Sequence, residues 1–310
     1  MIYIAGIDGG ASKTHCMIGD ADGNVLAEGF SAGSNHQAVG LEKAGEAIQS
    51  ALAEASGKLG IKERDIRFTV LGLAGADLEP DFAALNEVCG RILPPGSYQV
   101  INDTWIGLRA GIPENWGIVT NCGTGGSCAG RNKDGEEVRL RNLSFELGNF
   151  GGGVDIAKMA LHHAFRSEEK SGSTTALEQE IPKVAGVNSL DELISNVLSM
   201  NFDPEAFYAV PILVGELACL GDKVSQDILI KVGHEMGEIA GGVARRLHME
   251  DQRFKVTLVG SVFKSECPLL IDEYTTTLHR AAPYAQIGLA SQPSAMGAFS
   301  LACEAYRRKF

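Results

Sequence analysis

The chain has 310 residues, 45% of them hydrophobic, so it can bury two ordinary cores, and roughly 100–200 residues per domain favours two domains. The formal net charge of −12 argues against a nucleic-acid partner, because phosphate backbones repel such a surface. With no run of about 18 apolar residues and no basic segment at the start, the sequence predicts a cytoplasmic protein without a membrane partner.

The first third of the chain alternates between strand and helix patterns. Glycine turns separate its first three strands, and apolar residues at a spacing of 3.6 mark its helices. A fully apolar strand follows the first helix, as expected of a buried parallel strand. In chain order the expected elements are the strands 3–7, 15–19 and 25–30, the helix 41–59, the strand 68–73, the helix after Pro80, the strand 98–101 and the helix 105–110.

The same order of elements begins again at Gly117. Three strands with two turns come first, and a helical block at about 153–250 is inserted before the next strand. The expected elements are the strands 117–121, 127–131 and 137–140, a long amphipathic helix at 228–247, the strand 256–259, the helix 269–278, the strand 284–287 and a helix from Ala295. The sequence therefore predicts an α/β fold with an internally duplicated architecture.

Two glycine-rich turns occupy equivalent places in the two halves, within IDGGASKTH and NCGTGGS. Glycines let a backbone turn tightly and approach an anion, while N–H groups and hydroxyls donate hydrogen bonds to it. Either turn alone would read as an ordinary β-turn, but the pair predicts a site for the phosphates of ATP, with Asp8 as the candidate ligand of hydrated Mg²⁺. The candidate nucleotide contacts are Gly9, Gly10, Ser12, Lys13, Thr14, Gly123, Thr124 and Gly125.

These turns and several further blocks resemble the actin-like ATPase superfamily, and within it the BadF/BadG/BcrA/BcrD ATPase family, which contains N-acetylglucosamine kinase. The matching blocks are IDGGASKT, SNH at 34–36, LAGAD at 73–77, VIND at 100–103, CGTGGS at 122–127, VGSV at 259–262 and SAMGA at 294–298. The resemblance implies two ribonuclease-H-like domains. It places the first at 1–112, completed by a C-terminal helix at 298–310, and the second at 113–297 with the helical insertion. It also makes a homodimer possible.

Asp103 is the candidate catalytic residue. Phosphoryl transfer to a hydroxyl needs a carboxylate that accepts the hydroxyl proton. From spacing alone, an aspartate between a strand and a helix is more simply an N-cap, and Asp103 directly precedes Thr104. The resemblance favours the other reading, because Asp103 matches the family's catalytic aspartate.

The resemblance also implies contacts to the acceptor and to the nucleoside. Asn35 matches the family's asparagine for amino sugars, although Gly33-Ser34-Asn35 is also typical of a turn. Gly260 and Ser261 match the loop along the adenine–ribose pocket, where the backbone makes the contact. Two roles stay open for Asp77: a group near Mg²⁺ or the cap of the following helix. The remaining acceptor contacts are His36, Gly126, Ser127 and Asn149.

One segment, NLSFELGNFGGG at 142–153, departs from the amino-sugar kinases. Asn142, Leu143 and Ser144 stand where those kinases have GWG, and Asn149 and Phe150 stand in place of their acidic pair. An amide donates as well as accepts hydrogen bonds, and the replacement removes a negative charge. The sequence therefore leaves the acceptor open among amino sugars, related sugars and polyols.

Three functions compete on this sequence. The first is an ATP-dependent kinase for a small-molecule hydroxyl, and the second is an ATPase that activates a partner enzyme. The third is a binding or regulatory protein that has lost phosphoryl transfer. Activator members of the family bind an iron–sulfur cluster through cysteines, and no cysteine pair occupies such a place here.

Overall fold

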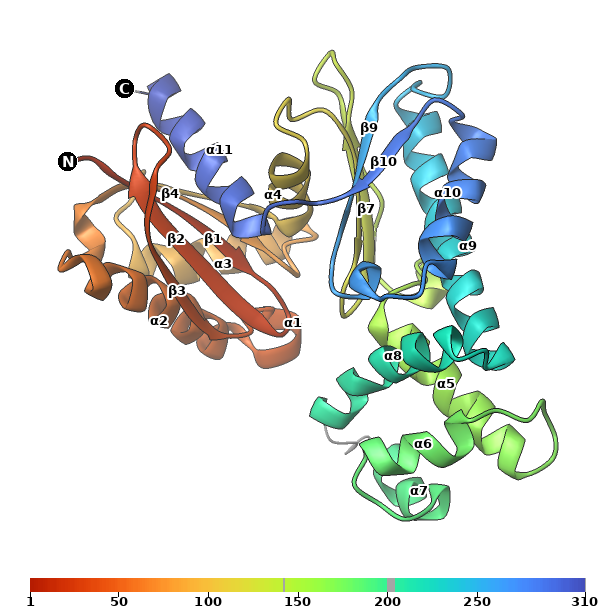
Figure 1. The fold of residues 1–310 in the computed structure, drawn as a ribbon. Coiled ribbons are helices and arrows are strands. Elements are labelled where there is room, and N and C mark those ends of the chain that lie inside the picture. The colour runs from red at the N-terminus through yellow and green to blue at the C-terminus, as the bar shows by residue number, and fades with distance from the viewer. Residues whose placement is uncertain (142, 200–203, 310) are drawn as a thin grey trace. The chain divides into compact units, whose positions relative to one another are not determined.

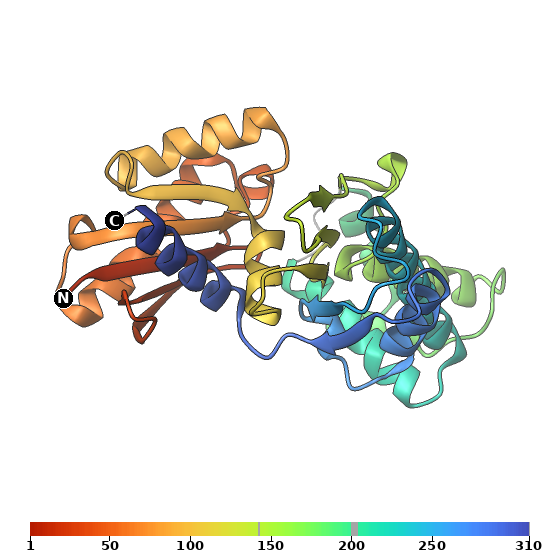
Figure 2. The ribbon, with the colours of Figure 1, turned by 90° about the horizontal axis from the view of Figure 1, so that it is seen from above.

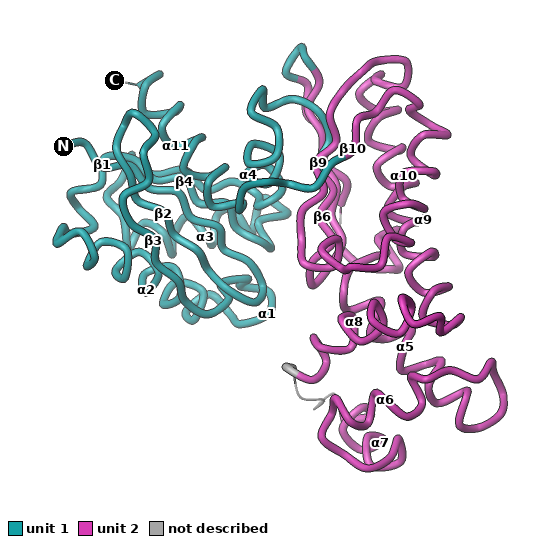
Figure 3. The backbone as a smooth tube through the Cα atoms, in the orientation of Figure 1, with its two compact units in different colours: residues 1–119, 133–135, 288–310 teal, residues 120–132, 136–287 magenta. Residues whose placement is uncertain are grey.

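A computed structural model describes residues 1–141, 143–199 and 204–309. Within them the chain forms two compact units, shown in different colours in Figure 3. The first unit comprises residues 1–119, 133–135 and 288–310, and the second comprises 120–132 and 136–287. No helix in the described part of the chain is both long enough and apolar enough to cross a membrane. The domain limits given above, at 112/113 and 297/298, stay a prediction.

The first unit is built on a five-stranded sheet with the order β3-β2-β1-β4-β5. β1 pairs with β2 in antiparallel and with β4 in parallel orientation, and β4 pairs with β5 in parallel. Its elements are β1 (Tyr3–Gly9), β2 (Lys13–Asp20), β3 (Val25–Ala32), α1 (His36–Val39), α2 (Leu41–Leu59), β4 (Ile66–Leu73), α3 (Glu79–Ile92), β5 (Tyr98–Asn102), α4 (Asp103–Gly111) and α11 (Ser294–Lys309).

Helices cover both faces of this sheet, as Figures 1 and 2 show. Neighbouring residues of a strand point to opposite faces. Ala5 and Ile7 therefore pack with α2 and α3 in one core, whereas Ile4 packs with α4 and α11 in the other. The first unit is thus a three-layer α/β/α arrangement.

Two glycines let α11 pack closely against the rest of the first unit. A Cβ added at Gly6 would lie 2.0 Å from the Phe299 nitrogen, so the backbone of α11 touches β1. A Cβ added at Gly297 would lie 1.9 Å from the carbonyl oxygen of Ile106 in α4. Neither contact leaves room for a side chain, and both fix the position of a helix that follows the second unit in the chain.

The second unit contains most of the other five-stranded sheet, whose strand order is β10-β9-β6-β7-β8. Helices α9 and α10 pack against each other, and the buried Tyr274 hydroxyl of α10 lies 2.8 Å from the Thr120 hydroxyl of β6. Its elements are β6 (Gly117–Cys122), β7 (Gly126–Arg131), β8 (Glu137–Arg139), α5 (Gly153–Glu168), α6 (Leu177–Val184), α7 (Leu190–Leu198), α8 (Pro204–Cys219), α9 (Lys223–Arg246), β9 (Lys255–Val259), α10 (Leu269–Ala281) and β10 (Gln286–Leu289).

Both sheets follow one plan. In each, the strands stand in the order third, second, first, fourth, fifth, counted along their own half of the chain. The helical block α5–α9 follows the third strand of the second half, at the place that α2 occupies in the first half. The duplicated architecture and the helical insertion expected from the sequence are therefore confirmed.

Three local expectations need correction. The strand expected at 284–287 is β10, Gln286–Leu289, because Ala282–Ala285 close a turn before Gln286 donates to the Phe254 carbonyl. The helix expected at 105–110 begins earlier, at Asp103, because Asn102 caps it. The short helix α1 carries no apolar periodicity and was not expected.

Candidate active site

The first glycine turn joins the ends of β1 and β2 in the first unit. The Gly10 N–H donates to the Lys13 carbonyl at 3.0 Å, which closes the turn. Ser12 and Lys13 are exposed at its tip, so a hydroxyl and an ammonium group are accessible to an anionic ligand. This geometry suits phosphate binding.

Thr14 makes its side-chain hydrogen bonds within the protein. Its side chain is buried, and its hydroxyl lies 2.8 Å from the Ala32 carbonyl and 2.9 Å from Ser34 Oγ. These bonds fasten β2 to the end of β3. Within the first turn, Ser12 and Lys13 are therefore the polar side chains that remain exposed.

The segment after β3 is held directly against the first glycine turn. The Gly10 carbonyl accepts from the N–H groups of Ser34 at 2.9 Å and Asn35 at 3.2 Å. A Cβ added at Gly33 would lie 2.0 Å from the Ala11 carbonyl oxygen. These main-chain contacts place Asn35 beside the turn.

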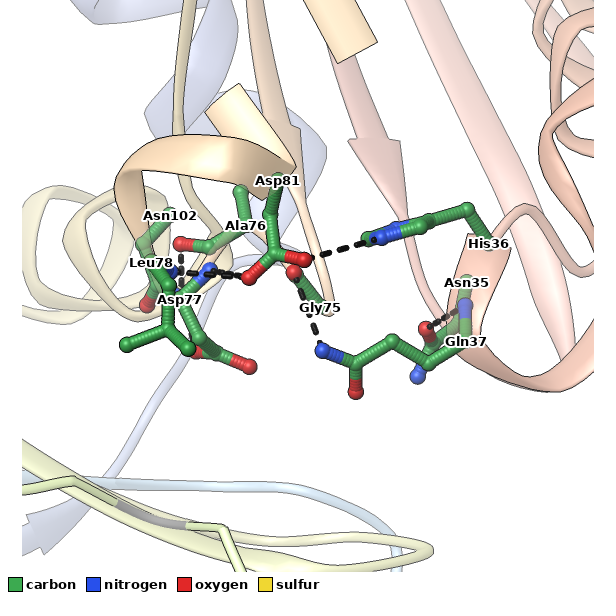
Figure 4. Close-up of polar contacts among 9 residues, drawn as sticks. All are labelled: Asn35, His36, Gln37, Gly75, Ala76, Asp77, Leu78, Asp81 and Asn102. Carbon is green, nitrogen blue, oxygen red and sulfur yellow. Dashed lines mark hydrogen bonds and ion pairs between the residues drawn. The ribbon is translucent and has the colours of Figure 1, made fainter. Parts of the chain in front are cut away.

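Asn35 and His36 face a second loop, the one that follows β4 (Figure 4). Asn35 Oδ1 caps α1 by accepting from the Gln37 N–H at 3.0 Å, so the turn role anticipated from the sequence exists. His36 Nε2 lies 3.2 Å from Asp81 Oδ1, and its Nδ1 is buried without a hydrogen-bond partner among the described residues. Gly75 was missed by the sequence reasoning: its φ is +82°, and a Cβ there would lie 2.6 Å from Asn35 Oδ1.

Asn102, the last residue of β5, performs the capping that the sequence analysis considered for Asp103. Its Oδ1 accepts from the Thr104 N–H at 3.1 Å, and its Nδ2 donates to Asp77 Oδ1 and the Ala76 carbonyl, both at 3.1 Å (Figure 4). Asp103 is thus the first residue of α4 and not its N-cap. The N-cap residue of α3 is Leu78, whose N–H donates to the Asp81 carboxylate at 2.8 Å.

Two carboxylates, Asp8 and Asp103, meet at this edge of the first sheet. β1 and β5 run parallel to β4, so their carboxyl ends come to the same edge. Burial and, after it, the nearby charge of Asp103 together raise the pKa of Asp8 from 3.8 to about 7, against the opposing effect of Lys13. Asp103 itself is partly exposed at the helix N-terminus, which favours a negative charge.

The second glycine turn joins β6 and β7 in the second unit. The Gly123 N–H donates to the Gly125 carbonyl at 3.1 Å, and the Gly123 and Thr124 carbonyls accept from the first N–H groups of α5. A Cβ at Gly152, whose φ is +102°, would lie 2.4 Å from the Gly125 carbonyl carbon. Backbone packed this closely leaves Thr124 and Gly125 at the surface, as a phosphate site requires.

Gly260 lies directly beside this second turn. Its φ is +106°, and a Cβ there would lie 2.2 Å from the Cys122 carbonyl oxygen. Only glycine fits both the backbone conformation and the close approach. The following Ser261 is exposed. The structure therefore brings Gly260 against Asn121 and Cys122.

The segment 142–153, which differs from the amino-sugar kinase pattern, also contacts the second turn. Asn149 Nδ2 donates to the Gly126 carbonyl at 3.1 Å, and the adjacent Ser127 Oγ is buried with no hydrogen-bond partner in the described part of the chain. An aspartate at 149 could not donate this bond. Asn142, the first residue of the segment, lies outside the described residues.

Known proteins with similar sequences are carbohydrate kinases and ATPases. A model of the BadF/BadG/BcrA/BcrD ATPase family matches residues 5–298. An N-acetylmuramic acid/N-acetylglucosamine kinase of Clostridium acetobutylicum is 31% identical over 302 residues, which are 97% of this chain and 98% of that protein. An N-acetyl-D-glucosamine kinase of Dictyostelium discoideum is 27% identical over 312 residues, with 96% of each chain covered.

Solved structures share the fold at lower sequence identity. A candidate N-acetylglucosamine kinase from Chromobacterium violaceum superposes with a TM-score of 0.77 at 20% identity, over 97% of this chain and 99% of that one. A ROK family glucokinase from Streptomyces griseus, solved with glucose and AMPPNP, has a TM-score of 0.63 at 17% identity, over 97% and 99%. At these identities the likeness establishes the two-domain, actin-like fold.

Proposed function

The chain belongs to the BadF/BadG/BcrA/BcrD ATPase family, and from that premise we propose that it transfers the γ-phosphoryl group of ATP to a hydroxyl of an amino sugar. The observation that carries the proposal is the pair Asp8 and Asp103 at one edge of the first sheet. The kinase names of the C. acetobutylicum and D. discoideum relatives support an amino sugar as the acceptor.

Asp103 is the proposed general base. Since Asn102 caps α4, the Asp103 carboxylate is not needed to hold the helix. A carboxylate at this position can orient the acceptor hydroxyl and take its proton as the hydroxyl attacks the γ-phosphorus. In the first unit, the proposed acceptor contacts are Asn35 and His36. The Asn35 Oδ1 atom lies 2.6 Å from where a Cβ on Gly75 would be. In the second unit, the proposed contacts are Gly126, Ser127 and Asn149.

Asp8 is the proposed Mg²⁺ ligand, and its surroundings fit a cation. Mg²⁺ keeps several waters and uses one or two carboxylates together with substrate phosphates. Burial and, after it, the charge of Asp103 make ionisation of Asp8 unfavourable, and a divalent cation would relieve the repulsion between the two carboxylates. When bound, the metal would neutralise charge on the phosphates.

The two glycine turns are the proposed phosphate contacts. Gly9, Gly10, Ser12 and Lys13 would act from the first unit, where Thr14 supports the turn from within. Gly123, Thr124 and Gly125 would act from the second unit, and Gly260 and Ser261 would contact the nucleoside. Main-chain N–H groups and hydroxyls stabilise the charge of the transferred group without needing to reorganise.

The test is ADP release by the purified protein with Mg-ATP and a panel of N-acetylglucosamine, N-acetylmuramic acid, glucosamine, glucose and polyols. We expect release only when an amino sugar is present. Asp103→Asn should lower kcat by roughly 10²–10⁴-fold, because the proton acceptor is lost, while ATP still raises the thermal midpoint as in the wild type. Equal turnover by wild type and Asp103→Asn would contradict the assigned role.

A further inference from the structure

Beside the second glycine turn, the second unit contains a hollow of about 490 Å³, within the roughly 300–1,000 Å³ typical of small-molecule sites. It lies between the end of β8, the segment that follows it, and one face of α9. Its lining residues are Arg139, Leu140, Arg141, Leu147, Gly148, Asn149, Ile239 and Arg246.

The charge of this lining is unlike that of the whole protein. Three of its residues are arginines and, among the described residues that form it, none is acidic, although the chain carries a formal net charge of −12. Arg141 and Arg246 form no ion pair with a described residue. Guanidinium groups present planar donor pairs that match carboxylate and phosphate oxygens. The hollow is therefore suited to an anionic group.

The hollow is also connected to the proposed acceptor site. Asn149 lines it and donates to the Gly126 carbonyl of the second glycine turn. Asn149 and Phe150, which follow Gly148 in this segment, place no negative charge beside the hollow. Lys231 Nζ lies 5.6 Å from the centre of the Phe150 ring and adds a cation to the same segment.

We infer that the hollow binds an oxyanion carried on a sugar, with Arg141 and Arg246 as the specificity-determining residues. This inference rests on the proposed function and refines it. The oxyanion has two possible sources that share this chemistry: the carboxylate of an acidic acceptor such as N-acetylmuramic acid, or the phosphate of a phosphorylated sugar.

The experiment compares wild type, Arg141→Gln, Arg246→Gln and the double variant in the full-length chain. Arg245→Gln is the matched control, since Arg245 is the neighbouring exposed arginine on α9 but does not line the hollow. Calorimetry without ATP measures binding of N-acetylmuramic acid, N-acetylglucosamine and N-acetylglucosamine 6-phosphate. Kinetics with ATP give the ratio of kcat/KM for the acidic and the neutral acceptor.

A charged hydrogen-bonded pair corresponds to roughly 10–100-fold in affinity. If the acceptor supplies the oxyanion, the double variant binds N-acetylmuramic acid at least tenfold more weakly and the kcat/KM ratio falls equally. If a phosphorylated sugar supplies the oxyanion, the double variant loses affinity only for N-acetylglucosamine 6-phosphate. Arg246→Lys, which keeps the charge but loses the planar fork, should recover part of the loss.

Unchanged binding of both anionic probes in the double variant would overturn the inference, as would an equal loss in Arg245→Gln or no binding of either probe by the wild type. Failure of the proposed function looks different. In that case the wild type releases no ADP with any acceptor, while the calorimetric arm still reports whether an anion binds through Arg141 and Arg246.

Discussion

The carboxyl group of Asp8 is held in a state that disfavours its own charge. Burial and the charge of Asp103 raise its pKa from 3.8 to about 7, so at neutral pH much of the folded protein keeps the proton. The unfolded chain releases that proton near pH 4. Without a bound cation, the contribution of Asp8 to the free energy of unfolding therefore falls as the pH rises from about 4 to about 7.

The substitution Asp8→Asn removes the titrating carboxyl and with it this loss of folding free energy at higher pH. We expect the variant to exceed the wild type in free energy of unfolding by roughly 2–4 kcal/mol at pH 8, and by much less at pH 5, at about 1.4 kcal/mol per unit of pKa shift. Urea unfolding in EDTA at the two pH values measures the difference. Asp22→Asn, in the exposed turn between β2 and β3, is the control and should change little at either pH. A gain that is the same at pH 5 and pH 8 would refute the linkage.

The same proton competes with Mg²⁺. Below pH 7 the apparent affinity for Mg²⁺ should fall by up to about tenfold per pH unit, because Asp8 must lose its proton to bind a cation. Titration of ATP-dependent turnover with Mg²⁺ at pH 6 and pH 8 measures this. In Asp103→Asn the pKa of Asp8 should drop, so Mg²⁺ binding, followed by calorimetry with ATP, should be tighter at pH 6. An Mg²⁺ affinity that does not change with pH would exclude Asp8 as the ligand.

Among the elements, α11 shows most clearly how a close backbone contact fixes a helix. Gly6 and Gly297 let its backbone touch β1 and α4 without intervening side chains. The apolar residues of α11, including Phe299 and Ala302, then bury the second face of the first sheet.

Gly6→Ala should destabilise the protein by roughly 2–3 kcal/mol, because the added methyl group meets backbone atoms that cannot move aside. Chemical denaturation measures the change. Gly57→Ala, in α2, is the matched control: nothing lies within 4 Å of its added Cβ, and the better helix former should stabilise by about 0.5–1 kcal/mol. A neutral Gly6→Ala would mean that α11 is not held as described.

The elements also show where sequence reasoning succeeds and where it stops. Strand and helix patterns follow periodicity, so the duplicated order was predictable in both halves. The capping residue of α4 was not, because Asn102 and Asp103 are both good caps and only the backbone shows which one bonds to Thr104. Of the site, the glycine turns could be found from the sequence. The arginine-lined hollow could not, because Arg141 and Arg246 are more than a hundred residues apart.

In the whole molecule, the first unit depends on a segment that follows the second unit in the chain. α11 lies against β1, β4 and α4, all of them near the start of the sequence. Without α11 one apolar face of the first sheet would be open to water, which costs on the order of 25 cal/mol per Å².

Deletion of residues 294–310 should therefore unfold the first unit selectively. Hydrogen exchange should show loss of protection in β1, β4 and β5, while β6, β7 and α9 in the second unit keep theirs. This experiment also tests the predicted assignment of 298–310 to the first domain. Uniform loss of protection in both units would show that they fold as one, and unchanged protection would show that α11 is dispensable. Phe310 lies outside the described residues.

The position of α11 has a consequence for folding of the chain during translation on the ribosome. Strands β1–β5 leave the exit tunnel early, but the helix that covers one of their faces is translated only after the second unit. At about 5–20 residues per second, that face waits on the order of ten seconds or more in the nascent chain. Ile4, Val70 and Ile106, which pack with α11 in the folded chain, would stay uncovered during that interval, and a chaperone that shields apolar surface would act on the first unit while the second unit is being translated.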